Sequence, residues 1–319
     1  YPIEPEEKEI FRPPVHTVVM CHLFNLDDNP YRCESNFAQV VEEVTAIAKF
    51  GHLSEPVFLD RRIAVPWANV PYPGLRWASE LLGHVATEEQ MWSLFSTIYR
   101  LDSGWNSSFW EEQGNVLEYR KKALNKIGSA HVTLISDGWQ LEVELARDTL
   151  WAGGRTTLAS KRYFTPTLPV QSLHAALNST SAQGTFASSR PFYVLGTEVT
   201  GAWFTVQNGE VTEWQAKTGK AALDAFFSID EGSRYVSELS LADNDTIESR
   251  YLEKSIHPHF AKEITTSVIL GGFSLDTLTN QSNDDDIKQS KLNESLVRLE
   301  IPVGDTHLST SLRTDDEQT

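Results

Sequence analysis

The run 296–304 (LVRLEIPVG) places Arg298 and Glu300 at alternate positions between apolar residues. Residues two apart in a strand share one face, so we expect both charged side chains to point away from the apolar set. On an exposed face, such a pair contributes little to stability. If the face lines a cleft, the pair is a feature of a binding pocket.

A second carboxylate lies in an apolar, strand-like run over residues 229–242 (IDEGSRYVSELSLA). Glu238 stands two residues after Val236 and directly before Leu239. Burying a carboxylate there is costly unless it has a partner. Glu238 is therefore a candidate for a functional site.

The common local motifs of catalysis and metal binding are absent from this sequence. There is no G-x-S-x-G elbow, no Walker loop, no G-x-G-x-x-G and no H-E-x-x-H. The most metal-like string is His257-Pro258-His259. Proline favours extended backbone there, which predicts that the two imidazoles point to opposite faces and do not share one ion.

The composition is that of a globular protein and excludes several classes of function. Hydrophobic residues make up 40% of the 319 residues and charged residues 22%. With 27 Lys and Arg against 44 Asp and Glu, the net charge of −17 disfavours nucleic acid and anionic membranes as partners. The two cysteines, Cys21 and Cys33, are too few for a disulfide framework or a cysteine zinc site. We expect a cytoplasmic protein without a membrane span.

The periodicity changes from helical to strand-like near residue 130. A buried strand over 15–24 and a helix over 35–50 are predicted, and together they indicate an α/β layer. Residues 56–74 are rich in proline, which excludes long regular structure there. Helical spacing dominates residues 75–127. Asn208-Gly209 between two alternating runs predicts a β-hairpin. The other predicted strands are 131–135, 140–145, 202–206, 210–215, 266–270, 296–303 and 307–312, with a short helix over 217–228.

These patterns predict four segments: an N-terminal arm (1–14), an N-terminal α/β domain (15–127), a β-rich domain that holds the pocket (128–313) and a tail (314–319). The polar, acidic stretch 280–293 is predicted to be an exposed loop. The fold class is α/β in the broad sense that includes α+β.

Several segments, in order, resemble the M29 family of thermophilic-type metallo-aminopeptidases over about three quarters of the chain. They include VPYPGLRWASELLG, FSIDEGSRYVSELSLA, FAKEITTSVILGGF and NESLVRLEIPVGD. The resemblance implies the fold of that family, with a C-terminal M29-like domain, and a homodimer.

The resemblance also implies that this sequence lacks most of the family's metal ligands. The first ligand glutamate falls at Gln171 or Ser172, and the second is kept as Glu238. The histidine of the Asn-Ala-Ser-x-His string falls at Ser267. The closing His-x-Asp falls at Arg298 and Glu300, and a family tyrosine falls at Phe273 or Ser274.

Two neighbouring divalent ions need several carboxylate and imidazole ligands, so this set implies a pocket without metal or cofactor. Arg298 would neutralise Glu238 or Glu300 and could hold an anionic oxygen of a small-molecule substrate, with either glutamate as acid or base. The expected catalytic residues are Glu238, Arg298, Glu300, Ser267 and His307. The expected substrate-binding residues are Ser172, His174, Thr266 and Phe273.

Three functions stay open at this point. The first is metal-independent acid–base chemistry, such as cyclisation, isomerisation or elimination. The second is a non-catalytic ligand-binding or interaction protein. The third is a metalloenzyme with an unusual ligand set, either an aminopeptidase or an enzyme like the ring-cleaving 2,5-dihydroxypyridine dioxygenases, which the sequence also resembles. A rebuilt metal site would use Glu238, Glu300, His307 and His174.

Overall fold

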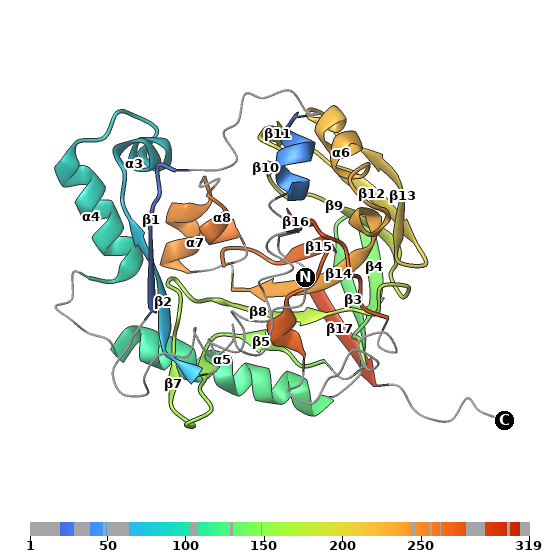
Figure 1. Cartoon of the computed structure of the whole chain (residues 1–319), viewed down its shortest axis with the longest axis horizontal. Coiled ribbons are helices and arrows are strands. Elements are labelled where there is room, and N and C mark those ends of the chain that lie inside the picture. Colours follow the sequence, from blue (N-terminus) through green and yellow to red (C-terminus); the bar gives the residue numbers. More distant parts are fainter. Residues whose placement is uncertain are drawn as a thin grey trace, which may run out of the picture.

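The structure is a computed structural model and has a mixed α/β fold (Figure 1). It describes residues 20–28, 39–46, 49, 64–101, 108–127, 130–147, 149–243, 246–254, 257–261, 263–278, 291–304 and 307–312. The predicted arm and tail lie outside these residues, as does most of the predicted loop 280–293.

The first part of the chain combines a small parallel sheet with helices. Strands β1 (Met20–Asn25) and β2 (Trp67–Tyr72) pair in parallel, so a short strand does form inside the proline-rich segment. Residues 39–46 are helical, within the helix predicted for 35–50. The helices that follow are α3 (Leu75–Leu82), α4 (Glu88–Tyr99) and α5 (Ser108–Ile127), which confirms the helical spacing of this region.

Helix α4 shows how local sequence sets these boundaries. The Thr87 side chain accepts from the backbone N–H of Gln90, and the Gln90 side chain accepts from the backbone N–H of Thr87, which forms a capping box. The helix ends where Arg100 turns to a φ of 58°. Its buried face (Met91, Leu94, Phe95, Ile98 and Tyr99) packs into a core shared with α3, Leu252, Phe260 and Ile264.

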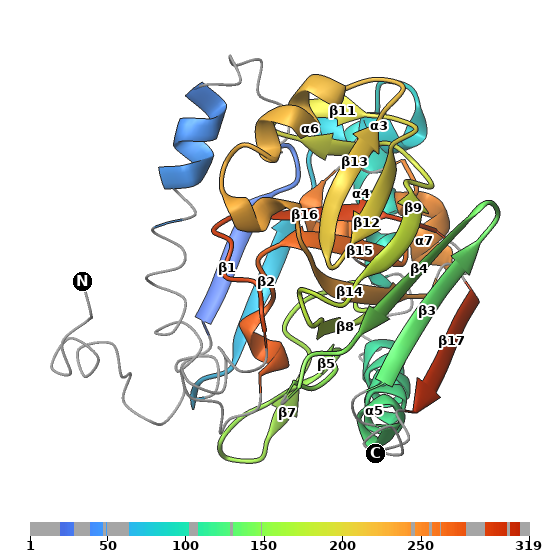
Figure 2. The same ribbon diagram turned by 90° about the vertical axis from the view of Figure 1, so that its right-hand side faces the viewer.

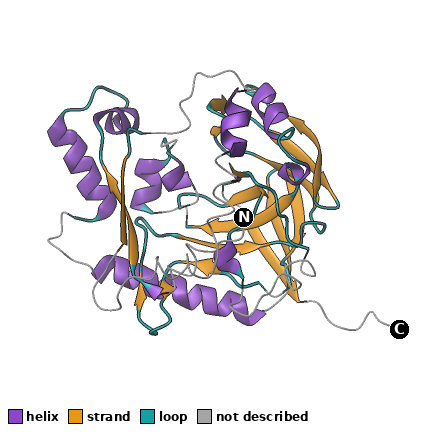
Figure 3. Cartoon of the chain, in the orientation of Figure 1, coloured by secondary structure: helices purple, strands orange, loops and turns teal. Residues whose placement is uncertain are grey.

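Two antiparallel sheets dominate the rest of the molecule (Figures 2 and 3). The six-stranded sheet has the order β13-β12-β9-β4-β3-β17. Its strands are β3 (Ala130–Ser136), β4 (Trp139–Glu144), β9 (Gln183–Ala187), β12 (Trp203–Gln207), β13 (Glu210–Gln215) and β17 (His307–Leu312). The predicted hairpin at Asn208-Gly209 is confirmed, with φ of 50° and 84°.

The five-stranded sheet has the order β16-β15-β14-β8-β5. Its strands are β5 (Ala152–Gly153), β8 (Ser172–Ala176), β14 (Val236–Ala242), β15 (Ser267–Gly271) and β16 (Arg298–Pro302). The remaining elements are β6 (Thr156–Thr157), β7 (Tyr163–Phe164), β10 (Phe192–Val194), β11 (Thr197–Val199), α6 (Lys220–Phe226), α7 (Ile247–Leu252), α8 (Pro258–Ala261) and the 3-10 turns Glu231–Arg234 and Leu275–Thr277.

The two sheets share one hydrophobic core. Leu173, Leu239, Val268 and Leu299 from the five-stranded sheet belong to the same cluster as Leu141, Phe186 and Phe204 from the six-stranded sheet. Trp110 and Leu117 of α5 join this cluster as well. The domain boundary predicted between residues 127 and 128 stays a prediction. Helix α5, which precedes this boundary, contributes side chains to the core of the part that follows it.

Candidate functional site

Most polar residues of the five-stranded sheet lie on the face opposite the shared core. Cross-strand partners lie on one face of a sheet, so the register defines which side chains are neighbours. The register pairs Ser240 with both His174 and Ser267, and it pairs Ile269 with both Glu238 and Glu300. We call this side of the sheet the polar face. It comprises Ser172, His174, Glu238, Ser240, Ser267, Arg298 and Glu300.

The polar face is largely buried, although its residues are hydrophilic. Glu238 and Ser240 are fully buried, and His174, Ser172 and Ser267 are almost so. Arg298 and Glu300 keep 28% and 22% of their side chains exposed, so solvent reaches the face at the β16 edge.

Arg298 binds both carboxylates of this face. Its Nη1 and Nη2 each donate to one oxygen of Glu238 over 2.8 Å, which is a bidentate pair. Nη2 and Nε also donate to Glu300 Oε1, over 3.2 and 3.4 Å, and Nη1 donates to Ser274 Oγ over 3.1 Å. These five bonds use all five N–H groups of the guanidinium.

The pairing decides the charge of Glu238. Burial would by itself raise the pKa of this carboxyl, but the charge and hydrogen bonds of Arg298 outweigh burial and lower the pKa to about 2. The backbone N–H of Ser274 donates to Glu238 Oε2 over 2.7 Å and acts in the same direction. Burial would also lower the pKa of Arg298, and the two carboxylates raise it above its ordinary value. Both groups are therefore ionised at neutral pH.

The loop after β15 lies against the polar face and contributes two polar residues, Ser274 and Asp276. Ser274 contacts both Glu238 and Arg298. Two residues later, Asp276 Oδ1 lies 2.9 Å from His174 Nε2. Asp276 is half exposed while His174 is buried, so this pair connects the face to solvent.

The structure brings some of the predicted site residues together and places others elsewhere. Ser172, His174, Glu238, Ser267, Arg298 and Glu300 lie together on the polar face. Thr266 is buried directly before β15, and Phe273 is half-buried beside Ser274. His307 begins β17, which pairs with β3 at the edge of the other sheet. Its catalytic role stays a prediction, and so do the roles of the other residues.

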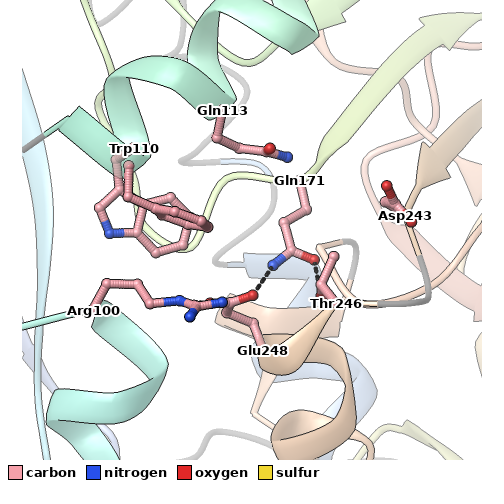
Figure 4. Close-up of a pocket in the computed structure, with 8 residues that line it drawn as sticks. Arg100, Trp110, Gln113, Gln171, Asp243, Thr246 and Glu248 are labelled. Carbon is pink, nitrogen blue, oxygen red and sulfur yellow. Dashed lines mark hydrogen bonds and ion pairs between the residues drawn. The ribbon is translucent and has the colours of Figure 1, made fainter.

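A neighbouring set of buried polar residues surrounds Gln171. Glu263 Oε2 accepts from the backbone N–H of both Gln171 and Ser172, over 2.8 and 2.9 Å, and so fixes the start of β8. The Gln171 side chain lines a pocket together with Arg100, Trp110, Gln113 and Glu248, among others (Figure 4). Of these residues, sequence patterns indicated only Gln171.

Within the motif His257-Pro258-His259, Pro258 and His259 are helical instead of extended. Pro258 is the first residue of α8, where a missing N–H costs nothing. The backbone N–H of His259 donates to His257 Nδ1 over 3.1 Å, and the two ring centroids lie 6.3 Å apart. The expectation of opposite faces is therefore wrong, because the proline starts a helical turn. His257 packs against Phe24 and Phe260.

Replacing His257 is expected to change the acid stability of the protein. Burial, and then the charge of His259, lower the pKa of His257 from its usual 6.5 to about 4. The unfolded chain binds this proton below pH 6.5 and the folded chain does not, so stability falls as the pH falls from 6.5 to 4. At about 1.4 kcal/mol per pH unit, the loss is about 2 to 3 kcal/mol.

Denaturant unfolding at several pH values tests this expectation. His257→Asn keeps an acceptor for the His259 N–H and should remove this part of the pH dependence. The matched control is His84→Gln, because His84 is exposed. If His257→Asn and the parent lose the same free energy between pH 6.5 and pH 4, the expectation is wrong.

Comparisons with known proteins identify relatives of this chain. The profile of the family described as "Thermophilic metalloprotease (M29)" matches residues 33–319. Aminopeptidase T of Thermus aquaticus is 25% identical over 241 residues, which cover 75% of this chain and 59% of that protein. The chain therefore spans about three fifths of the length of this relative.

Two solved structures also match. Wild-type AmpT from Thermus thermophilus superposes with a TM-score of 0.70 at 22% identity, covering 82% of this chain and 64% of that one. A 2,5-dihydroxypyridine dioxygenase from Pseudomonas putida KT2440 reaches a TM-score of only 0.42 at 11% identity, covering 86% of this chain and 94% of that one. The first match supports the fold.

The metal ions that the family description implies do not fit the residues of the polar face. Ser172 and Ser267 offer only hydroxyls, and every N–H of Arg298 faces a protein acceptor. Both oxygens of Glu238 accept hydrogen bonds from Arg298. Within the described part of the chain, no three His, Cys, Asp or Glu residues are grouped so that they could hold a metal.

No described helix has the length and apolar character that a membrane span requires.

Proposed function

Although the chain belongs to the thermophilic metalloprotease (M29) family, we propose that it uses the M29 fold for acid–base chemistry on a small organic molecule without a metal ion. The observation that carries this proposal is the guanidinium of Arg298, whose five N–H groups bind Glu238, Glu300 and Ser274. A fixed cation stands where the resemblance assigns a metal-binding imidazole.

Arg298 and Glu238 serve as positioning residues in this proposal. Arg298 has no N–H left for a substrate oxygen, and a carboxyl with a pKa of about 2 does not exchange protons near neutral pH. Their ion pair supplies the buried charge balance of the face and holds Glu300 Oε1 in place.

Glu300 is the proposed proton-transfer residue. Arg298 binds its Oε1, whereas no described residue donates to its Oε2. The side chain is 22% exposed, so the second oxygen can reach a molecule at the β16 edge. His174 and Asp276 form a second pair that can hold a proton, and general acid–base catalysis commonly uses two such groups.

The charges of the face indicate the kind of substrate. Glu238, Glu300 and Asp276 contribute three carboxylates against the one guanidinium of Arg298. An anion would meet net repulsion there, so the proposal favours a neutral or cationic molecule over the anionic oxygen expected at Arg298. Peptide hydrolysis, which the relatives' names imply for those proteins, is not part of the proposed function, and a homodimer stays a prediction.

The experiment follows solvent deuterium into candidate substrates. Isomerisation and elimination at carbon begin when a base removes a C–H proton. In heavy water, the reverse of this step returns a deuteron to the carbon atom. The purified protein, freed of metal and kept in excess chelator, is incubated in heavy water with a panel of small carbonyl compounds and amines. Mass spectrometry should detect deuterium incorporation that Glu300→Gln abolishes and the exposed control Glu294→Gln preserves.

Other outcomes separate the competing functions. Turnover that appears only after cobalt, manganese or zinc is added, including hydrolysis of leucine p-nitroanilide, would show that the chain is a metalloenzyme. Ligands that raise the melting temperature without any exchange or turnover would identify a binding protein. Either result overturns the proposal.

A further inference from the structure

A pocket around Gln171 lies beside the polar face and shares no residue with it. It has a volume of about 240 Å³ and lies between the end of α4, the start of α5 and the start of α7 (Figure 4). Its lining residues are Arg100, Phe109, Trp110, Gln113, Gln171, Asp243, Thr246 and Glu248. This volume is below the usual range for drug-sized ligands, so the pocket suits a molecule of about ten heavy atoms.

One side of the pocket is a polar network whose members bind one another. Gln171 Nε2 donates to Glu248 Oε2 over 3.1 Å, and Thr246 Oγ1 donates to Gln171 Oε1 over 2.8 Å. Arg100 Nε donates to the other oxygen of Glu248, a residue that is almost fully buried. Because these groups satisfy one another, this side is formed before a ligand enters and needs little reorganisation on binding.

The side formed by α5 is aromatic. Trp110 Nε1 donates to the backbone carbonyl of Tyr99 over 3.0 Å, which fixes the buried indole ring. Phe109 packs edge-on against Trp110, with the ring centroids 5.0 Å apart. Aromatic rings prefer edge-on or offset contacts with one another, and a further ring can make such contacts with this pair. The α5 side therefore suits a ligand with a small aromatic ring.

The charged residues of the lining are already paired with opposite charges. Arg100 forms an ion pair with Glu248. Asp243 Oδ2 lies 3.7 Å from Arg120 Nη2, and this ion pair is not the only interaction of Asp243. A charged ligand would lose its hydration here without gaining a free counter-charge, whereas an uncharged ligand avoids that cost. The pocket therefore favours an uncharged ligand.

Gln113 offers hydrogen bonds that the polar network does not use. Its side chain projects from α5 into the space between Trp110 and Gln171, and its amide binds no described residue (Figure 4). A glutamine amide has two N–H donors and one acceptor oxygen. A carboxamide on a ligand has the same groups, so the two amides can each donate to the oxygen of the other. A carboxylate could only accept from Gln113, and an amidinium could only donate to it.

We propose that this pocket binds a small, uncharged aromatic carboxamide. The aromatic ring lies against Trp110 and Phe109, and the carboxamide exchanges two hydrogen bonds with Gln113. The inference does not depend on the proposed acid–base chemistry, because the pocket shares no residue with Glu300 or Arg298 and the test measures binding alone.

Isothermal titration calorimetry at pH 7 with three probes of the same shape tests the proposal. The probes 2-phenylacetamide, phenylacetate and 2-phenylacetamidine have the same number of heavy atoms and are neutral, anionic and cationic. We expect 2-phenylacetamide to bind with a dissociation constant of about 1 mM. The two charged probes should bind about ten-fold more weakly or not at all, because each loses hydration and keeps only one of the two hydrogen bonds.

Two substitutions of Gln113 locate the binding. Gln113→Leu keeps the approximate size of the side chain and removes both hydrogen bonds, so it should weaken 2-phenylacetamide about five-fold. Gln113→Glu places an acceptor-only, anionic group at the same position, so it should bind 2-phenylacetamidine more tightly than 2-phenylacetamide. The matched control is Gln207→Leu, which makes the first change at an exposed position on β12 and should leave all three affinities unchanged.

Three results would each overturn the proposal. The first is no binding of 2-phenylacetamide to the parent protein. The second is a charged probe that binds the parent as tightly as 2-phenylacetamide does. The third is an unchanged affinity for 2-phenylacetamide in Gln113→Leu, with circular dichroism showing that the variant is folded.

Discussion

Replacing Arg298 by methionine is expected to lower the free energy of unfolding by about 3 to 5 kcal/mol. The substitution leaves Glu238 fully buried without its cation, and it removes two hydrogen bonds of 2.8 Å from that carboxylate. A carboxylate in this position either pays the cost of desolvation or takes up a proton. Urea unfolding at pH 7, followed by tryptophan fluorescence, measures the change.

The double variant Glu238→Leu, Arg298→Met shows whether the cost comes from the unpaired charge. Replacing both members of a buried ion pair by apolar residues is often neutral, so this variant should regain most of the stability. Lys122→Met is the control for loss of a cation, because the Lys122 side chain is 75% exposed. Stability of Arg298→Met within about 0.5 kcal/mol of the parent would contradict the role that we give to this pair.

Four substitutions on the polar face are expected to create a metal site. The variant Ser172→Glu, Ser267→His, Arg298→His, Glu300→Asp places the ligand types of the resembled family beside Glu238. All five positions lie on one face of four neighbouring strands. We expect at least one zinc or cobalt ion per chain by elemental mass spectrometry. At a metal concentration 100 times the dissociation constant, the gain in stability is about 2.7 kcal/mol.

The triple variant that keeps Arg298 isolates the effect of the guanidinium. Ser172→Glu, Ser267→His, Glu300→Asp adds two metal ligands and retains the cation, so it should bind no more metal than the parent. Circular dichroism confirms that each variant is folded before metal is added. Near-stoichiometric metal in the parent, or equal binding by the triple and quadruple variants, would show that Arg298 does not replace the metal charge.

Much of the scaffold around the site was predictable from local patterns. Alternation over 296–303 predicted β16 and placed Arg298 and Glu300 on one face, which the register confirms. The Asn208-Gly209 hairpin and helices α4 and α5 followed from turn chemistry and helical spacing. Strand β8 was not predicted, because all five of its residues are buried and no alternation marks it.

The contacts that define the site depend on pairs far apart in the chain. Arg298 meets Glu238 across 60 residues, and His174 meets Asp276 across 102. Nothing in the local sequence marks Asp276, which follows β15 in a short 3-10 turn. Glu248 and Glu263 were likewise unmarked, because their partners lie far away in the chain: Glu248 binds Arg100, and Glu263 binds the backbone N–H groups of Gln171 and Ser172.

Sequence patterns alone identified the family resemblance and the strands that carry Glu238, Arg298 and Glu300, and they predict the loss of the usual metal-ligand side chains. These properties depend on residue type and short-range spacing, which the chain carries before it folds. The packed structure was needed to show that all N–H groups of Arg298 bind protein acceptors and that no described residue donates to Glu300 Oε2. Hydrogen-bond partners and burial arise from the packing of distant strands, and they set the charge state and therefore the chemistry of each group.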